Sequence, residues 1–339
     1  MRDPLPSVTS RTRRSALRRL PLSTFCMLVL ALTLPLLGNF DLAAQLSPVT
    51  ATVIKIDPPT GMRAHGAPVA SAGLGVSLNV QSSEPPVFGR SRHESFYSPS
   101  LGRAMSYWIY LPPSYRATEQ RYPVLYMLHG LNGSDQQWKD MGLFDQADAL
   151  IRARQIAPLI IVTPQGDNGY WMNHIDGGPR WADYVTRDLI PQIDQSYRTL
   201  ADGPHRAIGG LSMGGHGAIQ LALNNPGLFD VVGGHSAVFR SETEAFPFFG
   251  TGAEYQRRDP VSLVQQGLPT PFALWLDIGA LDPWLPRTHY FHELLLARGA
   301  AHSWQLDDGD HSQDYWQPRI PLYLAWYDQQ LRSGGIAAP

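Results

Sequence analysis

The segment that most constrains this chain is the run AIGGLSMGGHGA at residues 207–218, in which Gly210, Ser212 and Gly214 spell G-x-S-x-G. A short apolar run with a β-strand pattern precedes it, and a helical run follows it. Strand, tight turn and helix in this order are what a nucleophile elbow requires, because the turn exposes the serine hydroxyl at the end of the strand. The segment therefore predicts a strand-to-helix turn with Ser212 as a candidate nucleophile.

The glycines of this pattern have a steric reason. A serine at so sharp a turn adopts a strained backbone conformation, and side chains two positions away on either side would collide with the neighbouring strand and helix. The same turn places the N–H of Met213 at the start of a helix, where the helix dipole and unpaired donors favour an oxyanion. The pattern is short, however, and a flexible loop or a close helix–strand packing site would also account for it.

The first 44 residues predict an export signal. Five arginines between residues 11 and 19 precede an apolar run at residues 20–37, and small residues follow up to Ala44, the predicted cleavage site. Arg13 and Arg14 also resemble the pair of a twin-arginine signal. An uncleaved membrane anchor is the alternative, but two prolines within the apolar run favour a signal. We therefore predict an exported protein, periplasmic or secreted, with no stable membrane span after cleavage.

Cysteine content and charge exclude several function classes. Cys26, the single cysteine, lies in the predicted leader, so a chain cut after Ala44 has no disulfide, thiolate metal site or cysteine nucleophile. The formal charge is −2 overall, and the leader carries six arginines and two aspartates, so the remaining residues sum to −6. That charge argues against a nucleic-acid partner. Residues 45–85, rich in Pro, Ala, Gly and Ser, predict a flexible extension.

Residues 86–333 predict one folded domain, followed by a short tail at residues 334–339. Two strand patterns joined by a turn, at residues 93–98 and 104–111, come first, and further strand patterns then alternate with helical ones. The predicted helices include residues 138–154, 181–196, 289–298 and 315–331. This order predicts an α/β fold with a mostly parallel central sheet, helices on both faces and an antiparallel N-terminal start.

Candidates for a base and an orienting acid follow predicted strands. Functional side chains of an open parallel sheet gather at the carboxyl ends of its strands. His311 comes directly after the last predicted strand, and Asp282 lies in the loop after the strand before it, three residues past Gly279. His311 is therefore the candidate base and Asp282 the candidate acid. The alternatives that remain open for the acid are Asp277, Asp308 and Asp310.

The chain order Ser212, Asp282, His311 is the order of α/β-hydrolases. In such a triad His311 would take the proton of Ser212, Asp282 would hold one imidazole tautomer, and Ser212 would attack an acyl carbon. Two backbone donors are then required for the oxyanion. The candidates are the N–H groups of Met213 and, in the loop after the third predicted strand, of Leu131.

On these residues the chain resembles an esterase family of α/β-hydrolases that includes esterase D and S-formylglutathione hydrolases, feruloyl, acetylxylan and enterochelin esterases, and the antigen 85 mycolyltransferases. The resemblance spans roughly residues 107–331. It is carried by LYMLHGL at 125–131, DLIPQID at 188–194, RAIGGLSMGG at 206–215, Gly279 with Asp282, and Gly309-Asp310-His311 with Trp316. The resemblance implies that Ser212, Asp282 and His311 are the triad and that Leu131 and Met213 carry the oxyanion N–H groups.

Departures from this pattern narrow the expected function. The S-formylglutathione hydrolases are cytosolic and have a cysteine-containing loop after the oxyanion strand, whereas residues 132–135 here are NGSD behind an export leader. No feature encodes the long lipid channel of antigen 85. We expect an exported serine carboxylic-ester hydrolase acting on small-molecule or carbohydrate-linked esters, such as acyl, feruloyl or acetyl esters of sugars. An acyltransferase is the second reading, and a non-catalytic binding module, the third, is disfavoured because all three triad residues are present.

The substrate pocket is less well defined. Its candidate residues are His129, Trp171, His235 and Trp284, and core or turn packing explains each aromatic side chain equally well. No histidine falls in a recognised metal-ligand spacing, and the triad chemistry requires no cofactor, so neither is expected. The oligomeric state stays open.

Overall fold

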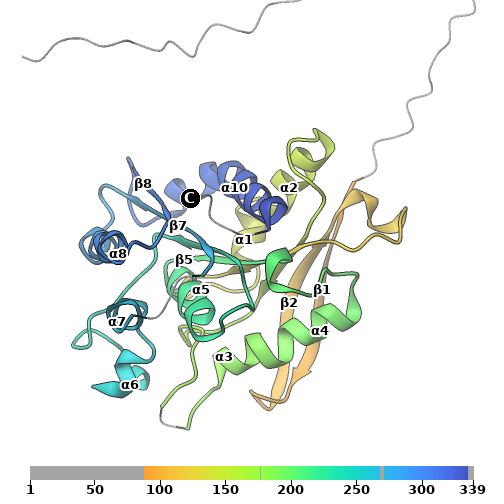
Figure 1. Ribbon diagram of the computed structural model, residues 1–339. Helices are drawn as coiled ribbons and strands as arrows, with labels where there is room; N and C mark the ends of the chain where they lie inside the picture. Colours follow the sequence, from red (N-terminus) through yellow and green to blue (C-terminus); the bar gives the residue numbers. More distant parts are fainter. Residues whose placement is uncertain (1–87, 176, 268–270, 335–339) are drawn as a thin grey trace, which may run out of the picture. The chain divides into compact units, whose positions relative to one another are not determined.

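The computed structural model describes residues 88–175, 177–267 and 271–334 (Figure 1). The predicted export signal (1–44), the predicted extension (45–85) and residues 335–339 of the predicted tail lie outside the described residues. Within the described part of the chain, no helix has the length and apolar character that crossing a membrane requires.

Eight strands form one sheet in the order β1-β2-β4-β3-β5-β6-β7-β8. The strands are β1 (Arg90–Ser98), β2 (Arg103–Leu111), β3 (Val124–Leu128), β4 (Ile160–Pro164), β5 (Arg206–Leu211), β6 (Val231–His235), β7 (Ala273–Gly279) and β8 (Ser303–Asp307). The pairs β1–β2 and β2–β4 are antiparallel, and every other neighbouring pair is parallel. The predicted antiparallel start and mostly parallel sheet are therefore confirmed.

Helices cover both faces of the sheet (Figure 1). They are α1 (Gln137–Asp140), α2 (Leu143–Arg152), α3 (Trp181–Asp183), α4 (Ile190–Ser196), α5 (Met213–Asn224), α6 (Ala253–Gln256), α7 (Pro260–Gln265), α8 (Leu285–Ala297), α9 (Gln313–Trp316) and α10 (Ile320–Ser333). One hydrophobic cluster packs α1, α2 and α10 on one face, and a second packs α5, α7 and α8 on the other. Strands β3 to β7 are buried along their whole length, as strands covered on both faces must be.

Several predicted helices are interrupted, each at a residue that disfavours a continuous helix. The predicted helix at residues 138–154 is two helices, because Gly142 between α1 and α2 adopts φ +88°, outside the helical region. The predicted terminal helix is split into α9, a 3₁₀ turn and α10, and Pro318 and Pro321 lack the N–H that a continuous helix would use. Between α3 and α4 lies a π-helical segment, Tyr184–Leu189, shortly before Pro191.

A histidine inside the second cluster makes stability depend on pH. His216 of α5 is fully buried among aromatic rings, and burial lowers the pKa of its imidazole to about 4 from its usual 6.5. The unfolded chain therefore binds a proton between pH 6.5 and 4 that the folded chain does not. The neutral, buried imidazole therefore contributes to the free energy of unfolding fully above about pH 6.5. This contribution is lost as pH falls from about 6.5 through about 4, a change of about 3 kcal/mol in the free energy of unfolding.

We expect His216→Gln to flatten the acid limb of a plot of unfolding free energy against pH. The amide keeps a donor for the Arg258 carbonyl, which lies 3.1 Å from His216 Nε2, but does not titrate. Urea unfolding at pH 7.5 and 5.0 measures the effect. Equal slopes in the parent and His216→Gln would contradict the prediction.

Candidate active site

Ser212 lies at the junction of β5 and α5 in a strained backbone conformation. Its φ of 56° and ψ of −117° are values that side-chain-bearing residues rarely adopt. Three hydrogen bonds hold its backbone: Ser212 N–H donates to the His235 carbonyl at 2.9 Å, and the Ser212 carbonyl accepts the N–H of Val238 at 3.1 Å and that of His216 at 3.2 Å. The strained conformation is therefore maintained by His235 at the end of β6, by Val238 in the segment after it and by His216 of α5.

The glycines on either side of Ser212 allow this turn. A Cβ on Gly210 would lie 2.5 Å from the Gly214 carbonyl carbon, and a Cβ on Gly214 would lie 2.3 Å from the Leu128 carbonyl oxygen. Real Cβ atoms do not approach backbone atoms so closely. The steric clash that the sequence pattern predicts is therefore with the backbone of Gly214 on one side and of Leu128 on the other.

Gly214→Ala should destabilise the fold by about 3 kcal/mol, because the added methyl meets backbone that cannot rotate away. The midpoint of urea unfolding measures the loss. Gly102→Ala is the control, since Gly102 has φ +65° but no atom beyond its chain neighbours lies within 4 Å of the place that a methyl would take. That variant should lose only about 1 kcal/mol for the left-handed backbone. Equal losses in the two variants would rule out the steric explanation.

The structure brings the three predicted triad side chains into one hydrogen-bonded chain. His311 Nε2 lies 2.9 Å from Ser212 Oγ, and His311 Nδ1 lies 2.7 Å from Asp282 Oδ2. An ionised carboxylate only accepts, so Nδ1 carries the hydrogen and Nε2 directs its lone pair at the serine hydroxyl. The Asp282 side chain is fully buried, whereas 20% of the His311 side chain is exposed. The chain of contacts is open to solvent only at its serine and histidine end.

Close contact between two loops fixes the aspartate beside the histidine. A Cβ on Gly279 would lie 2.3 Å from the Gly309 carbonyl oxygen, and Leu281 N–H donates to that carbonyl at 2.9 Å. Asp282 Oδ1 accepts the N–H of Trp284 at 2.8 Å, which leaves Oδ2 for His311.

The alternative acids lie elsewhere. Asp308 and Asp310 are exposed, and Asp310 accepts the hydroxyl of Ser312. Asp277 binds His235 instead of His311. Of the four aspartates, only Asp282 lies within hydrogen-bond distance of the His311 ring.

The loop after β3 lies directly against the elbow. A Cβ on Gly130 would lie 2.7 Å from Leu211 Cδ1 and 3.3 Å from Ser212 Cβ. Gly130 N–H donates to Gln137 Oε1 at 2.8 Å, while no hydrogen bond among the described residues uses the N–H of Leu131. Met213 is the first residue of α5, where an N–H has no partner within the helix. Neither N–H group is therefore used by a hydrogen bond among the described residues, as the predicted role of oxyanion donor requires.

The ring of His129 links the loop after β3 to the loop after β4. Gly166 N–H donates to its Nε2 at 2.9 Å, so Nδ1 carries the hydrogen and donates to the Gly130 carbonyl at 2.8 Å. Burial lowers the pKa of the imidazole and keeps it neutral, as this tautomer requires.

The four residues predicted for a substrate pocket are placed differently from one another. His129, Trp171 and His235 are 1%, 0% and 0% exposed, so their side chains have no surface to present to a substrate in this structure. Trp284 is half-buried, its backbone N–H donates to Asp282, and the guanidinium of Arg240 lies 4.9 Å from its ring centroid. Trp284 is thus the one of the four that remains accessible.

A cavity of about 640 Å³ lies where β1 begins and α4 ends, and none of its lining residues belongs to the predicted triad.

Among the residues that the structure describes, no group of three or more His, Cys, Asp or Glu side chains is arranged to hold a metal ion.

Two residues that support the site were not predicted from the sequence. Gln137 holds the oxyanion loop through Gly130, and Thr288 of α8 donates to the Ala237 carbonyl at 3.0 Å in the segment after β6. A glutamine and a threonine at the start of helices carry no distinctive pattern, so no sequence signal would have found them.

The strand order and the placement of the elbow after β5 and the histidine after β8 are those of an α/β-hydrolase. A family model described as "Putative esterase" matches residues 98–327. The chain therefore belongs to this esterase family, and the predicted resemblance is confirmed.

Curated relatives share part of the chain. An esterase of Mycobacterium tuberculosis is 32% identical over 170 residues, which cover 49% of this chain and 36% of that protein. An endo-1,4-beta-xylanase/feruloyl esterase of Xylanibacter ruminicola is 32% identical over 149 residues, which cover 42% of this chain and 20% of that protein. The matched stretches thus span about a third or less of the length of these relatives.

Solved structures agree on the fold. A ferulic acid esterase aligns with a TM-score of 0.66 at 24% identity, covering 72% of this chain and all of the other. An S-formylglutathione hydrolase from Agrobacterium tumefaciens aligns with a TM-score of 0.63 at 23% identity, covering 73% and 98%. The α/β-hydrolase fold predicted from the sequence is therefore confirmed.

Proposed function

We propose that this protein is an exported serine carboxylic-ester hydrolase that works through an acyl-enzyme. The observation that carries the proposal is the continuous hydrogen-bonded chain from Ser212 Oγ through His311 to the buried Asp282. Ser212 is the nucleophile, His311 the general base and acid, and Asp282 the group that orients the imidazole. Membership of the esterase family supports the reaction class.

The two half-reactions use the same groups. His311 Nε2 takes the hydroxyl proton as Ser212 Oγ bonds to the acyl carbon, and the carbonyl electron pair moves onto oxygen. The tetrahedral intermediate collapses, and His311 returns the proton to the departing alcohol. Water then enters, loses a proton to His311 and attacks the acyl carbon, which releases the acid and restores the serine hydroxyl.

The oxyanion formed in each step is held by the N–H groups of Leu131 and Met213. Both are backbone donors whose positions are set by the fold before substrate arrives, so no reorganisation is needed during the reaction. Removal of one such donor in a comparable site costs about 10² to 10³ in rate.

For the substrate we propose acyl, feruloyl or acetyl esters of sugars. Feruloyl esterase activity appears in the name of the relative from Xylanibacter ruminicola and in that of a solved structure with the same fold. Trp284 supports this class, because its backbone N–H donates to Asp282 and its half-buried indole is a ring on which an aromatic acid or a sugar can stack. Export is supported by the leader pattern at residues 1–44 and by polysaccharide esters lying outside the cell.

A panel of esters tests the proposal. The purified protein is incubated with p-nitrophenyl acetate, p-nitrophenyl butyrate, methyl ferulate and acetylated xylan, and the released acid is measured. We expect turnover of both p-nitrophenyl esters and of at least one of the two plant-type esters. A folded protein that hydrolyses none of the four would contradict the proposed function.

Product analysis separates hydrolysis from acyl transfer, for which the same triad would serve. With glucose or trehalose added to the assay, a hydrolase releases free acid at an unchanged rate. Formation of the sugar ester at the expense of free acid would instead assign the chain to the acyltransferases.

A further inference from the structure

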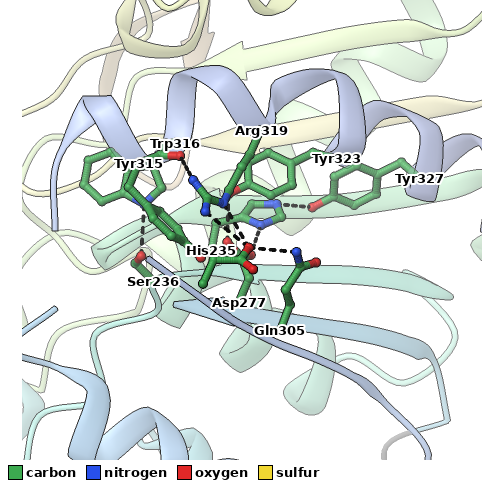
Figure 2. A network of polar contacts seen from close by, with 10 residues as sticks. His235, Ser236, Asp277, Gln305, Tyr315, Trp316, Arg319, Tyr323 and Tyr327 are labelled. Carbon is green, nitrogen blue, oxygen red and sulfur yellow. Dashed lines mark hydrogen bonds and ion pairs between the residues drawn. The ribbon is translucent and has the colours of Figure 1, made fainter. Parts of the chain in front are cut away.

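A second histidine–aspartate pair, which the proposed reaction does not use, joins β6 to β7 (Figure 2). His235 ends β6, Asp277 lies opposite it on β7, and His235 Nδ1 is 2.6 Å from Asp277 Oδ1. Their side chains are 0% and 1% exposed. Two ionisable groups buried so completely cost free energy unless their hydrogen bonds are made.

Two tyrosines of α10 complete those hydrogen bonds, as Figure 2 shows. Tyr327 OH lies 3.0 Å from His235 Nε2, and Tyr323 OH donates to Asp277 Oδ2 at 2.8 Å. Burial, together with the nearby Asp277 carboxylate, raises the pKa of both phenols far above their usual value, so both keep their hydrogens. Every donor is satisfied when Tyr327 donates to Nε2 and Nδ1 donates to Asp277.

The sheet has a slot that admits Tyr327. Gly209 of β5 and Gly233 of β6 are paired in register, and a Cβ on either would lie within 2 Å of the Tyr327 hydroxyl oxygen, at 1.8 and 1.9 Å. The phenol thus reaches the plane of the strands only because both side chains are absent. We call the Tyr327–His235–Asp277–Tyr323 set the buried polar chain.

The buried polar chain is joined directly to the strained Ser212 through the backbone of His235. The carbonyl of His235 accepts the N–H of Ser212, and Val238, three residues on, donates to the Ser212 carbonyl. The same segment is tied to β7, since Ser236 N–H donates to the Asp277 carbonyl at 2.8 Å. The backbone that holds Ser212 at positive φ is therefore anchored by the side chain of His235 and by the strand that carries Asp277.

We propose that His235 is a positioning residue, which acts through its own carbonyl to hold Ser212 in the strained conformation, and that the buried polar chain sets its place. The inference rests on the proposed function of Ser212. Without the polar chain, the end of β6 can shift, the Ser212 peptide can relax, and its Oγ moves relative to His311 and the oxyanion donors. A displacement of about 1 Å in such a site can cost about 10²-fold in rate.

Four substitutions test this inference. His235→Leu removes both ring nitrogens, His235→Asn keeps a donor that can reach Asp277, and Tyr327→Phe removes one hydroxyl. Tyr126→Phe is the matched control, because Tyr126 is fully buried in β3 and its hydroxyl makes no hydrogen bond to a residue of the buried polar chain. Steady-state kcat and KM on p-nitrophenyl butyrate, the pH profile of kcat and the urea midpoint are measured for each.

We expect kcat to fall about 10-fold or more in His235→Leu and several-fold in Tyr327→Phe, with KM within twofold of the parent. The pH profile should keep its shape, since His311 and Asp282 are untouched, and His235→Asn should recover most of kcat. The Tyr126→Phe variant should match the parent.

Three results would overturn the inference. The first is an unchanged kcat in His235→Leu and Tyr327→Phe at a temperature where both are folded, even if their urea midpoints fall, because that is a structural role alone. The second is an equal loss in Tyr126→Phe, and the third is no recovery in His235→Asn. The proposed function is judged separately: activity retained in Ser212→Ala removes it, whereas full activity in the His235 variants removes only the positioning role.

Discussion

Replacement of Ser212 by alanine is expected to lower kcat on p-nitrophenyl butyrate by about 10⁶-fold. The variant lacks the only atom that His311 Nε2, 2.9 Å away, can activate for attack on the acyl carbon. The oxyanion donors and the binding surface remain, so a residual rate of about 10³ to 10⁴ over the uncatalysed reaction should persist. The loss is measured from initial rates at enzyme concentrations high enough to detect this residual activity.

A folded variant is needed for this result to be informative. The urea midpoint of Ser212→Ala should equal or exceed that of the parent. Alanine keeps the Cβ of serine and its packing, and it removes only a hydroxyl. Labelling with a fluorophosphonate, which forms a bond to an activated serine, should be lost completely. Hydrolysis at the parent rate would end the proposed mechanism, whatever the fold.

Asp282→Asn is expected to lower kcat by about 10⁴-fold with little change in KM. The amide nitrogen can donate to His311 Nδ1, which favours the tautomer with hydrogen on Nε2. In that tautomer Nε2 has no lone pair for the serine proton. Steady-state kcat and KM on p-nitrophenyl butyrate measure the loss.

Asp310→Asn provides the matched control, because Asp310 is exposed and is adjacent in sequence to His311 but bonds to Ser312. It should keep kcat within twofold of the parent. A large loss in Asp310→Asn together with a small one in Asp282→Asn would transfer the orienting role to the other carboxylate.

Much of the fold could be predicted because local patterns determine it. The alternation of buried strands with helices predicted a mostly parallel sheet, and the two early strand patterns predicted its antiparallel start. Helix ends were harder. Gly142 and the prolines near residue 320 break helices that hydrophobic periodicity alone would continue, since periodicity reports which face is buried and not whether the backbone is continuous.

The residues of the candidate site also divide into those that the sequence could propose and those that it could not. Ser212 and the two candidate oxyanion donors, Leu131 and Met213, lie in local motifs, so the sequence could propose all three. The pocket residues could not be ranked, because burial separates Trp284 from Trp171, and both are tryptophans in loops. The catalytic roles stay predictions, to be tested by the two substitutions above.

By itself, the sequence determined the order in which the parts of this chain occur and the turn at Ser212, because a strand, a sharp turn and a helix depend on residues that are neighbours in the chain. Only the tertiary structure decided which aspartate meets His311, 29 positions away, and which meets His235, 42 positions away. The register of β6 on β7 places His235 opposite Asp277, and contact between the Gly279 and Gly309 loops brings Asp282 to His311. Strand register and loop contact are set by packing between distant segments, which no local pattern encodes.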